Sequence, residues 1–184
     1  MKRGLISYVA LLRGINVGGN GLVKMSDLRT IFEKMGFEGV RTYINSGNVF
    51  FRATERDPRA LEQSIERILA KAYSFRPKAA VRSKREIAAV VKGIPADWSG
   101  GPERKCNVIF LRPAIDSKNI LEDLKPKPGI EEVAYKPGVL YWSALTSDLT
   151  KSTMVKLSRS KLYQEMTVRN LNTAKKLHEI MEAM

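Results

Sequence analysis

Hydrophobic and polar positions follow one another along the chain in patterns that predict a mixture of strands and amphipathic helices. Leu5–Leu12 is apolar at nearly every position, which is typical of a strand covered on both faces. Ser26 is a potential helix cap, and Gly36 stands where that helix would end. Between them the apolar residues recur at helical spacing: Leu28, Ile31, Phe32 and Met35.

The rest of the first half predicts a hairpin, a helix and a closing strand. Val40–Ile44 and Val49–Arg52 are expected strands, joined by the turn Asn45–Asn48. Asp57-Pro58 combines a capping side chain with a proline in the first turn, which indicates a helix start. Lys78–Arg82 is the last strand. The order strand, helix, strand, strand, helix, strand is that of a ferredoxin-like α+β unit.

A second series of elements follows a linker. Ser83 and Glu86 form a capping box for a linking helix over 83–94, and Pro95–Pro102 breaks the pattern. Strands are expected at 107–112, 131–135, 139–145 and 166–169, short helices at 116–124 and within 150–160, and a last helix from about Asn170. This order repeats the first. The sequence therefore predicts an α+β protein of two ferredoxin-like βαββαβ subdomains, residues 1–96 and 97–184, through internal duplication, plus a C-terminal helix.

A central first strand that pairs antiparallel with the third places the loop Gly14–Gly21 and the turn Asn45–Asn48 at one end of the sheet. The connection Ser74–Lys78 is expected at the same rim. The candidate ligand-binding residues are Arg13, Asn16, Gly18, Gly19, Asn20 and Lys24 near the loop, Arg41, Tyr43, Asn45, Ser46 and Asn48 in the hairpin, and Arg169 in the second half. Such donors suit a carboxylate, a phosphate or a base edge.

The glycine loop has two interpretations. Its backbone N–H groups suit an anion cradle, but no Gly-Lys-Ser/Thr opens the following helix and the dinucleotide fingerprint lacks its third glycine. Asp27 in the first turn of that helix would also repel an anion. Alternatively, the glycines serve only a tight path from strand to helix, and Asn-Ser-Gly-Asn is ordinary turn chemistry.

The net charge of +13 is unevenly distributed. Residues 1–96 hold 18 Lys/Arg and 8 Asp/Glu, a net charge of +10. A basic half attracts nucleic acid or phosphorylated ligands, and it is equally consistent with a merely soluble surface. Phe50 and Phe51 face opposite sides of their strand, so only one could be displayed for base stacking. RNA binding on an open sheet is therefore not expected.

The sequence also excludes several kinds of site. The single cysteine, Cys106, and the single histidine, His178, exclude an intramolecular disulfide, a multi-thiolate metal site, and a histidine-based triad or metal pair within the chain. No apolar run approaches the roughly 20 residues that cross a bilayer. We expect a cytoplasmic protein with no membrane partner.

Four segments of the chain resemble the Domain of Unknown Function 1697 family: YVALLRGINVGGNG, VKMSDLR, VRTYINSGNVFF and TVRNLNT. The first three lie near the start and the last near the end, so the resemblance covers nearly the whole chain. It implies an α+β protein of two similar subdomains, and it brings no established activity, cofactor or site residues.

Three classes of function stay open. The first is a small binding protein whose rim takes an anionic ligand, such as a nucleotide, a nucleic acid or a phosphorylated metabolite. The second is an enzyme that acts on a small phosphorylated or carboxylated substrate at the same rim. The third is a protein-interaction module with no ligand site. The sequence indicates no particular cofactor or oligomeric state.

Overall fold

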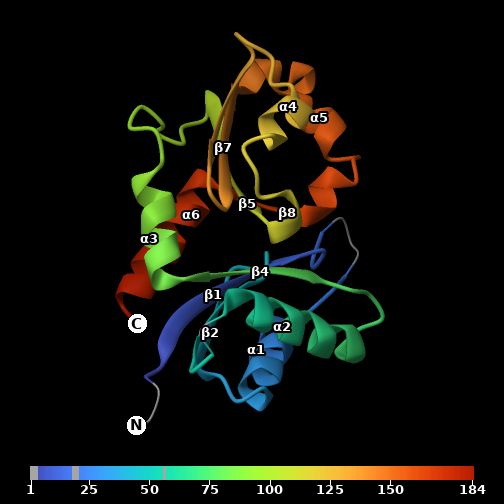
Figure 1. Cartoon of the computed structure of the whole chain (residues 1–184), viewed down its shortest axis with the longest axis vertical. Helices are drawn as coiled ribbons and strands as arrows, with labels where there is room; N and C mark the ends of the chain where they lie inside the picture. Colours follow the sequence, from blue (N-terminus) through green and yellow to red (C-terminus); the bar gives the residue numbers. More distant parts are fainter. Residues whose placement is uncertain (1–3, 18–20, 56) are drawn as a thin grey trace. The chain divides into compact units, whose positions relative to one another are not determined.

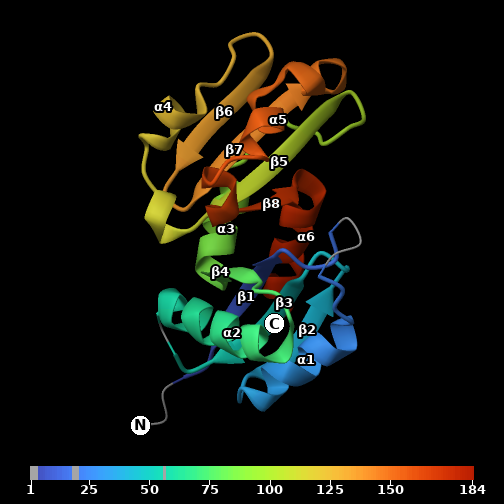
Figure 2. The same cartoon turned by 90° about the vertical axis from the view of Figure 1, so that its right-hand side faces the viewer.

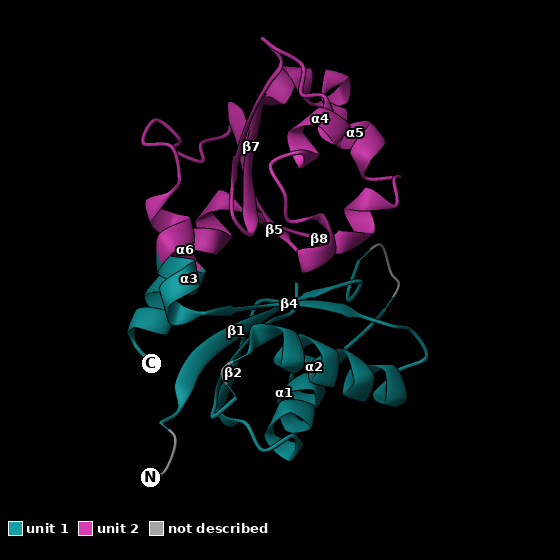
Figure 3. Ribbon diagram, viewed as in Figure 1, with its two compact units in different colours: residues 1–88, 177–184 teal, residues 89–176 magenta. Residues whose placement is uncertain are grey.

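The computed structural model of the chain describes residues 4–17, 21–55 and 57–184. It is an α+β protein with two four-stranded antiparallel sheets. The chain forms two compact units, residues 1–88 with 177–184 (unit 1) and residues 89–176 (unit 2), which Figure 3 distinguishes by colour.

Unit 1 contains the first sheet, in the order β2-β3-β1-β4. Its elements are β1 (Ile6–Arg13), α1 (Met25–Lys34), β2 (Glu38–Tyr43), β3 (Asn48–Ala53), α2 (Pro58–Ala72) and β4 (Lys78–Ser83). Strand β1 is central and runs antiparallel to both β3 and β4. Helices α1 and α2 cover one face of this sheet (Figure 1). The predicted pairing of the first strand with the third is confirmed.

The core of unit 1 lies between that face of the sheet and the two helices. It is built around Tyr8, Phe51, Phe32 and Ile65, with rings of Phe32 and Phe51 at 5.6 Å in an edge-to-face arrangement. All five residues from Tyr8 to Leu12 are at most 1% exposed, which confirms a first strand covered on both faces. Phe50 and Phe51 are both fully buried, so neither is displayed for base stacking.

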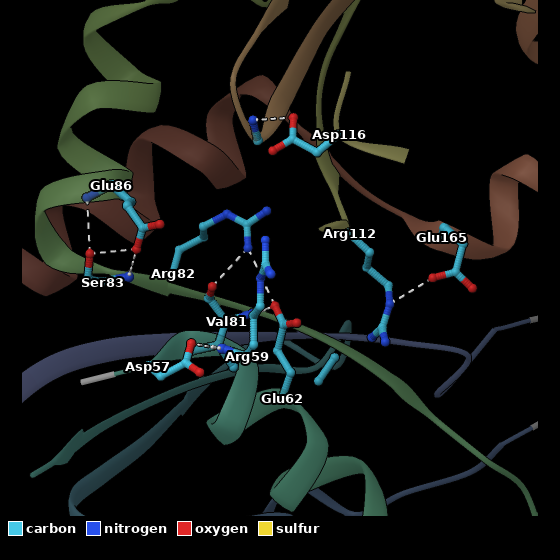
Figure 4. A network of polar contacts seen from close by, with 12 residues as sticks. Asp57, Arg59, Glu62, Val81, Arg82, Ser83, Glu86, Arg112, Asp116 and Glu165 are labelled. Carbon is cyan, nitrogen blue, oxygen red and sulfur yellow. Dashed lines mark hydrogen bonds and ion pairs between the residues drawn. The ribbon is translucent and has the colours of Figure 1, made fainter. Parts of the chain in front are cut away.

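Two of the predicted helix starts in unit 1 are confirmed, and one is wrong. Asp57 caps α2 through a hydrogen bond from the Arg59 N–H to its carboxylate at 2.9 Å. The capping box before α3 (Lys84–Lys92) is formed, because Glu86 accepts both the N–H and the hydroxyl of Ser83 (Figure 4). Ser26, however, does not cap α1.

The N-cap of α1 is Lys24, and Ser26 already lies inside the helix, where its hydroxyl contacts Asp27 at 3.3 Å. The reason lies upstream, in hydrogen bonds that hold the backbone of Val23 in place directly before the helix.

Unit 2 contains the second sheet, in the order β6-β7-β5-β8. Its elements are β5 (Arg104–Leu111), α4 (Ile120–Leu124), β6 (Glu131–Lys136), β7 (Val139–Leu145), α5 (Thr153–Leu157) and β8 (Met166–Asn170), with 3-10 segments at Pro113–Ile115, Thr146–Lys151 and Leu162–Glu165. Helices α4 and α5 pack on one face of this sheet (Figure 2). The last helix, α6 (Leu171–Glu182), runs from unit 2 into unit 1. The Oδ1 of Asn170 accepts the Thr173 N–H at 2.9 Å, so Asn170 caps this helix.

A buried carboxylate organises the helical side of unit 2. Glu131 is 6% exposed and accepts hydrogen bonds from the Trp142 indole at 2.7 Å and from the backbone N–H groups of Lys127 and Thr153. Burial raises the pKa of Glu131, but these hydrogen bonds outweigh it, so the pKa lies below its ordinary value. The carboxylate therefore stays ionised and joins β6 to β7 and to the start of α5.

Candidate functional site

The loop after β1 is held in shape by one asparagine. The carboxamide oxygen of Asn16 accepts the Val23 N–H at 2.8 Å, and its Nδ2 donates to the Val23 carbonyl at 3.0 Å. The backbone N–H of Asn16 donates to the Gly21 carbonyl at 2.9 Å. Asn16 itself has a φ of +50°, a left-handed conformation that asparagine adopts more readily than most residues. These contacts close the loop on itself.

A second asparagine closes the hairpin turn. Asn48 is fully buried, and its Nδ2 donates to the Tyr43 carbonyl and to the Ser46 hydroxyl, both at 3.0 Å. Asn16 and Asn48 thus both donate to backbone carbonyls of the protein itself.

The loop and the turn lie against each other, as predicted. Asn16 Nδ2 also donates to the Asn45 carbonyl at 2.9 Å, and the Leu12 N–H donates to the Gly47 carbonyl at 2.8 Å. The connection before β4 reaches the same place, because Phe75 lies next to Gly21. We call the described residues 13–17, 21–24 and 43–48 the loop–turn rim.

Two glycines of the rim are required by packing. Gly47 has a φ of +78°, and a Cβ there would lie 2.5 Å from Ile15 Cδ1 and 2.9 Å from Leu12 Cβ. A Cβ on Gly21, whose φ is +62°, would collide with the Gly14 carbonyl oxygen. Backbone conformation and packing therefore require glycine at both positions.

Positive charge collects on the side of the first sheet that faces away from α1 and α2. The inward residues of β1 and β4, such as Leu12 and Ala79, belong to the core beneath the helices, so their neighbours Arg13 and Lys78 point the other way. Arg13 and Lys78 are direct partners in the antiparallel register. By the same register this face also carries Arg41, Arg52 with Glu38 opposite it, and the buried Arg82, which lies 3.5 Å from Glu62.

The predicted site residues divide into five groups. Lys24, Arg41 and Asn45 are exposed, and Arg13, Asn16, Tyr43 and Ser46 are half-buried at the rim. Asn48 is buried in the turn. Gly18, Gly19 and Asn20 lie outside the described residues. Arg169 belongs to unit 2, whereas the rim is built from unit 1 alone.

Sequence reasoning missed the apolar part of the rim. Val17, Leu22 and Ile44 are 66%, 73% and 47% exposed. Ile44 also has a φ of +49°, a region that β-branched residues rarely occupy. A signal was present in the sequence, because these aliphatic residues stand within polar, glycine-rich segments where turn residues would be expected.

Among the described residues, no group of three or more His, Cys, Asp or Glu side chains is placed to hold a metal ion. The same part of the chain contains no helix with the length and apolarity needed to span a membrane.

The family of the chain follows from its sequence. The family model named DUF1697, described as a protein of unknown function, matches residues 5–141. The chain belongs to the DUF1697 family. The match includes the whole loop–turn rim. No curated protein matches the chain.

One solved structure is similar over nearly the whole chain. Conserved bacterial protein SP0830 from Streptococcus pneumoniae is similar with a TM-score of 0.84 and 26% identity, over 97% of this chain and 99% of that one. An unknown protein from Galdieria sulphuraria covers 91% of this chain and 98% of its own at 13% identity, but its TM-score of 0.26 is too low to indicate a shared fold.

The two units of this DUF1697 protein each bury an arginine on the edge strand next to the central one. Arg82 on β4 pairs with Val9, and Arg169 on β8 pairs with Val108. Both guanidinium groups donate Nη1 to the carbonyl of the preceding valine, at 2.8 Å for Arg82 and 2.9 Å for Arg169. Burial lowers the pKa of Arg169 to about 10, which leaves it charged at neutral pH.

Proposed function

We propose that unit 1 binds an anionic ligand at the loop–turn rim. The observation that carries this proposal is the cross-strand pair Arg13 and Lys78, two cations placed directly opposite each other where β1 ends and β4 begins. Two neighbouring cations make the local potential positive, which favours a carboxylate or phosphate as the ligand.

The surroundings of the pair support an anion as well. Lys24 is exposed within the rim, and Arg41 is exposed on β2, which leads into it. The first half of the sequence carries most of the net charge of +13. The uncapped start of α1 contributes little, because Asp27 in its first turn opposes an anion there.

A matched pair of double variants tests the proposal. Arg13→Gln/Lys78→Gln removes the cross-strand pair of cations, and Arg67→Gln/Lys71→Gln removes two exposed cations from α2 with the same change in net charge. The probes are fluorescein-labelled hexaglutamate and a twelve-residue oligothymidine in fluorescence anisotropy, with pyrophosphate, nucleoside triphosphates and sugar phosphates in a thermal-shift screen.

The rim variant is expected to bind the anionic probes at least about ten-fold more weakly than the parent, since each lost charge-assisted contact is worth about 1.5–3 kcal/mol. The α2 variant should bind like the parent. Equal weakening in both variants would mean that only overall charge matters, and would refute a site at the rim. Oligothymidine binding should show a steep salt dependence, about 0.7 log unit per phosphate contact per log unit of salt.

We also propose that the two units descend from one ferredoxin-like βαββαβ unit by duplication. The two sheets share one strand order, and Arg82 and Arg169 occupy equivalent register positions with equivalent hydrogen bonds. Each arginine is followed by a capping residue, Ser83 or Asn170, and then by a helix. Alignment of the family's two halves at these positions would test the proposal. Unrelated residues at both arginines in most members would contradict it.

A further inference from the structure

The two outer edges of the first sheet differ in how their backbone groups are satisfied. On β4, the N–H groups of Ala79, Val81 and Ser83 point away from β1. They are accepted at 2.8 Å by Glu66, Glu62 and Glu86 respectively. Three carboxylates therefore occupy this edge, and a further strand could not pair with it.

At the opposite edge, β2, the described residues place no carboxylate on the outward N–H groups. In an antiparallel ladder, successive residues direct their N–H and carbonyl groups to opposite neighbours. Because the Leu12 N–H donates to the Gly47 carbonyl, Asn48 and Phe50 on β3 direct their backbone groups toward β2. Tyr43 and Arg41 face those partners, and Thr42 points its N–H and carbonyl outward. Within the described ranges, no hydrogen bond reaches Thr42 from that side.

The open edge runs directly into an exposed aliphatic side chain. Ile44 follows β2, is 47% exposed, and adopts a φ of +49°. Neither burial nor backbone preference accounts for isoleucine at this position. The loop that carries Val17 and Leu22 is hydrogen-bonded to the turn next to Ile44, because Asn16 is bonded both to Asn45 and to Gly21. Strained residues that persist in this way are commonly found where a partner is bound.

Exposed cations border the same surface. Arg41 lies on β2 beside Thr42, and Lys24 lies two residues after Leu22. Aliphatic side chains have no π-face on which a base could stack, so they do not suit single-stranded nucleic acid. An outward N–H and carbonyl on a strand edge are matched by another polypeptide backbone.

We propose that an extended protein segment pairs with the open edge of β2, places carboxylates against Arg41 and Lys24, and packs aliphatic side chains on Ile44, Val17 and Leu22. This inference goes beyond the proposed function, because β2 is the edge strand opposite β4, whereas Arg13 and Lys78 lie on β1 and β4.

Defined peptides serve as probes, each fluorescein-labelled and twelve residues long. The first alternates Glu and Ser and carries two central Leu residues. The second has Ser in place of both Leu, and the third has Gln in place of every Glu. Two further versions of the first peptide are N-methylated on alternate residues, one at odd and one at even positions. Oligothymidine and phosphatidylglycerol vesicles represent the other macromolecular ligands.

The Glu/Leu peptide is expected to bind at least about ten-fold more tightly than either the Ser or the Gln version, because both the apolar and the charged contacts contribute. Only one of the two N-methylated isomers should lose binding. A paired strand donates alternate N–H groups to its neighbour, so one set of methyl groups blocks pairing and the other does not.

Ile44→Asn tests the contact from the protein's side. Asparagine accepts the left-handed backbone conformation readily, so the variant should fold at least as stably as the parent. It should bind the Glu/Leu peptide about five-fold more weakly and bind the Ser version with unchanged affinity. Val155→Asn, at an exposed aliphatic residue of unit 2, is the matched control and should change neither affinity.

Equal binding of the Leu and Ser peptides, or loss of binding with both N-methylated isomers or with neither, would overturn this inference and leave anion binding at the rim intact. Tighter binding of oligothymidine or of vesicles, sensitive to Ile44→Asn, would also overturn it in favour of that ligand. If no anionic probe binds in a way that depends on Arg13 and Lys78, the proposed function itself fails.

Discussion

The side chain of Asn16 donates to the backbone carbonyl of Asn45 at 2.9 Å, and this single bond joins two segments that stand 29 positions apart in the sequence. The same carboxamide also holds both backbone groups of Val23. One residue therefore fixes the loop, the turn and the start of α1 relative to one another. The exposed side chains of the rim depend on it for their positions.

Asn16→Ala is expected to destabilise the protein by about 2–4 kcal/mol. The substitution removes three hydrogen bonds and places alanine in a left-handed conformation. Urea denaturation followed by circular dichroism measures the loss. Asn16→Gly separates the two contributions, because glycine tolerates the backbone conformation and removes only the hydrogen bonds. An alanine variant as stable as the parent would show that the loop does not depend on this side chain.

Gly47 and Gly14 share a left-handed backbone but differ in their surroundings. Both have φ near +80°, yet a Cβ on Gly14 would meet nothing within 4 Å, whereas one on Gly47 would press on Ile15 and Leu12. Gly14→Ala should therefore cost about 1–2 kcal/mol from the backbone alone. Gly47→Ala should cost more, by a further 1–3 kcal/mol of overpacking.

Thermal unfolding of the two glycine variants under identical conditions compares these costs. A difference of 1 kcal/mol corresponds to roughly 2–4 °C for a chain of this size. Equal melting temperatures would show that the turn relaxes around the added methyl group.

Features governed by local chemistry could be predicted from the sequence. Asp57 and Asn170 cap their helices, and Ser83 forms its box with Glu86, because each of these contacts lies within a few residues. The shared rim could also be predicted, since antiparallel pairing around a central first strand leaves no other place for the two segments.

Features that depend on distant partners could not be predicted. The start of α1 at Met25 depends on the bonds between Asn16 and Val23, which override the capping tendency of Ser26. Glu62 and Glu66 reach the edge of β4 from α2, and nothing in the spacing of Glu62 indicates a partner at Val81. Ile44 in a left-handed conformation runs against its own preference, so sequence patterns predicted a strand residue there.

Glu62→Ala is expected to destabilise unit 1 by about 2–4 kcal/mol. Glu62 is buried, accepts the Val81 N–H at 2.8 Å, and lies 3.5 Å from the Arg82 guanidinium (Figure 4). Its removal leaves a buried donor unsatisfied and weakens the compensation of a buried charge. Urea denaturation gives the free energy of unfolding.

Two further variants define the role of this edge. Glu62→Gln keeps an acceptor oxygen for Val81 and should lose less stability than the alanine variant. Gln63→Ala, at the neighbouring exposed position of α2, should be nearly neutral. The Glu62 carboxylate also blocks the addition of a strand to the edge of β4. Glu62→Ala should therefore aggregate faster than Gln63→Ala in light scattering. Equal rates would show that the edge is protected by other means.

Glu131 should make unit 2 sensitive to acid. Hydrogen bonds from Trp142, Thr153 and Lys127 hold its folded-state pKa below the ordinary value despite its burial. A depressed carboxyl pKa contributes stability that is fully present above the unfolded-state pKa of about 4.3 and is lost as the pH falls through the folded-state pKa. Glu131→Gln is therefore expected to cost about 2–3 kcal/mol at pH 7, because an amide cannot accept all of these bonds.

The same substitution should make the loss of stability between pH 5 and pH 2 shallower than in the parent, because the titrating group is gone. Urea denaturation at several pH values, followed by tryptophan fluorescence, measures both effects. Glu132→Gln is the matched control. Glu132 is an exposed neighbour on β6 whose ion pair with Arg104 is worth at most about 1 kcal/mol. Glu132→Gln should therefore leave the loss of stability in acid nearly unchanged. If the free energy of unfolding falls as steeply with acid in Glu131→Gln as in the parent, other carboxylates cause the acid sensitivity.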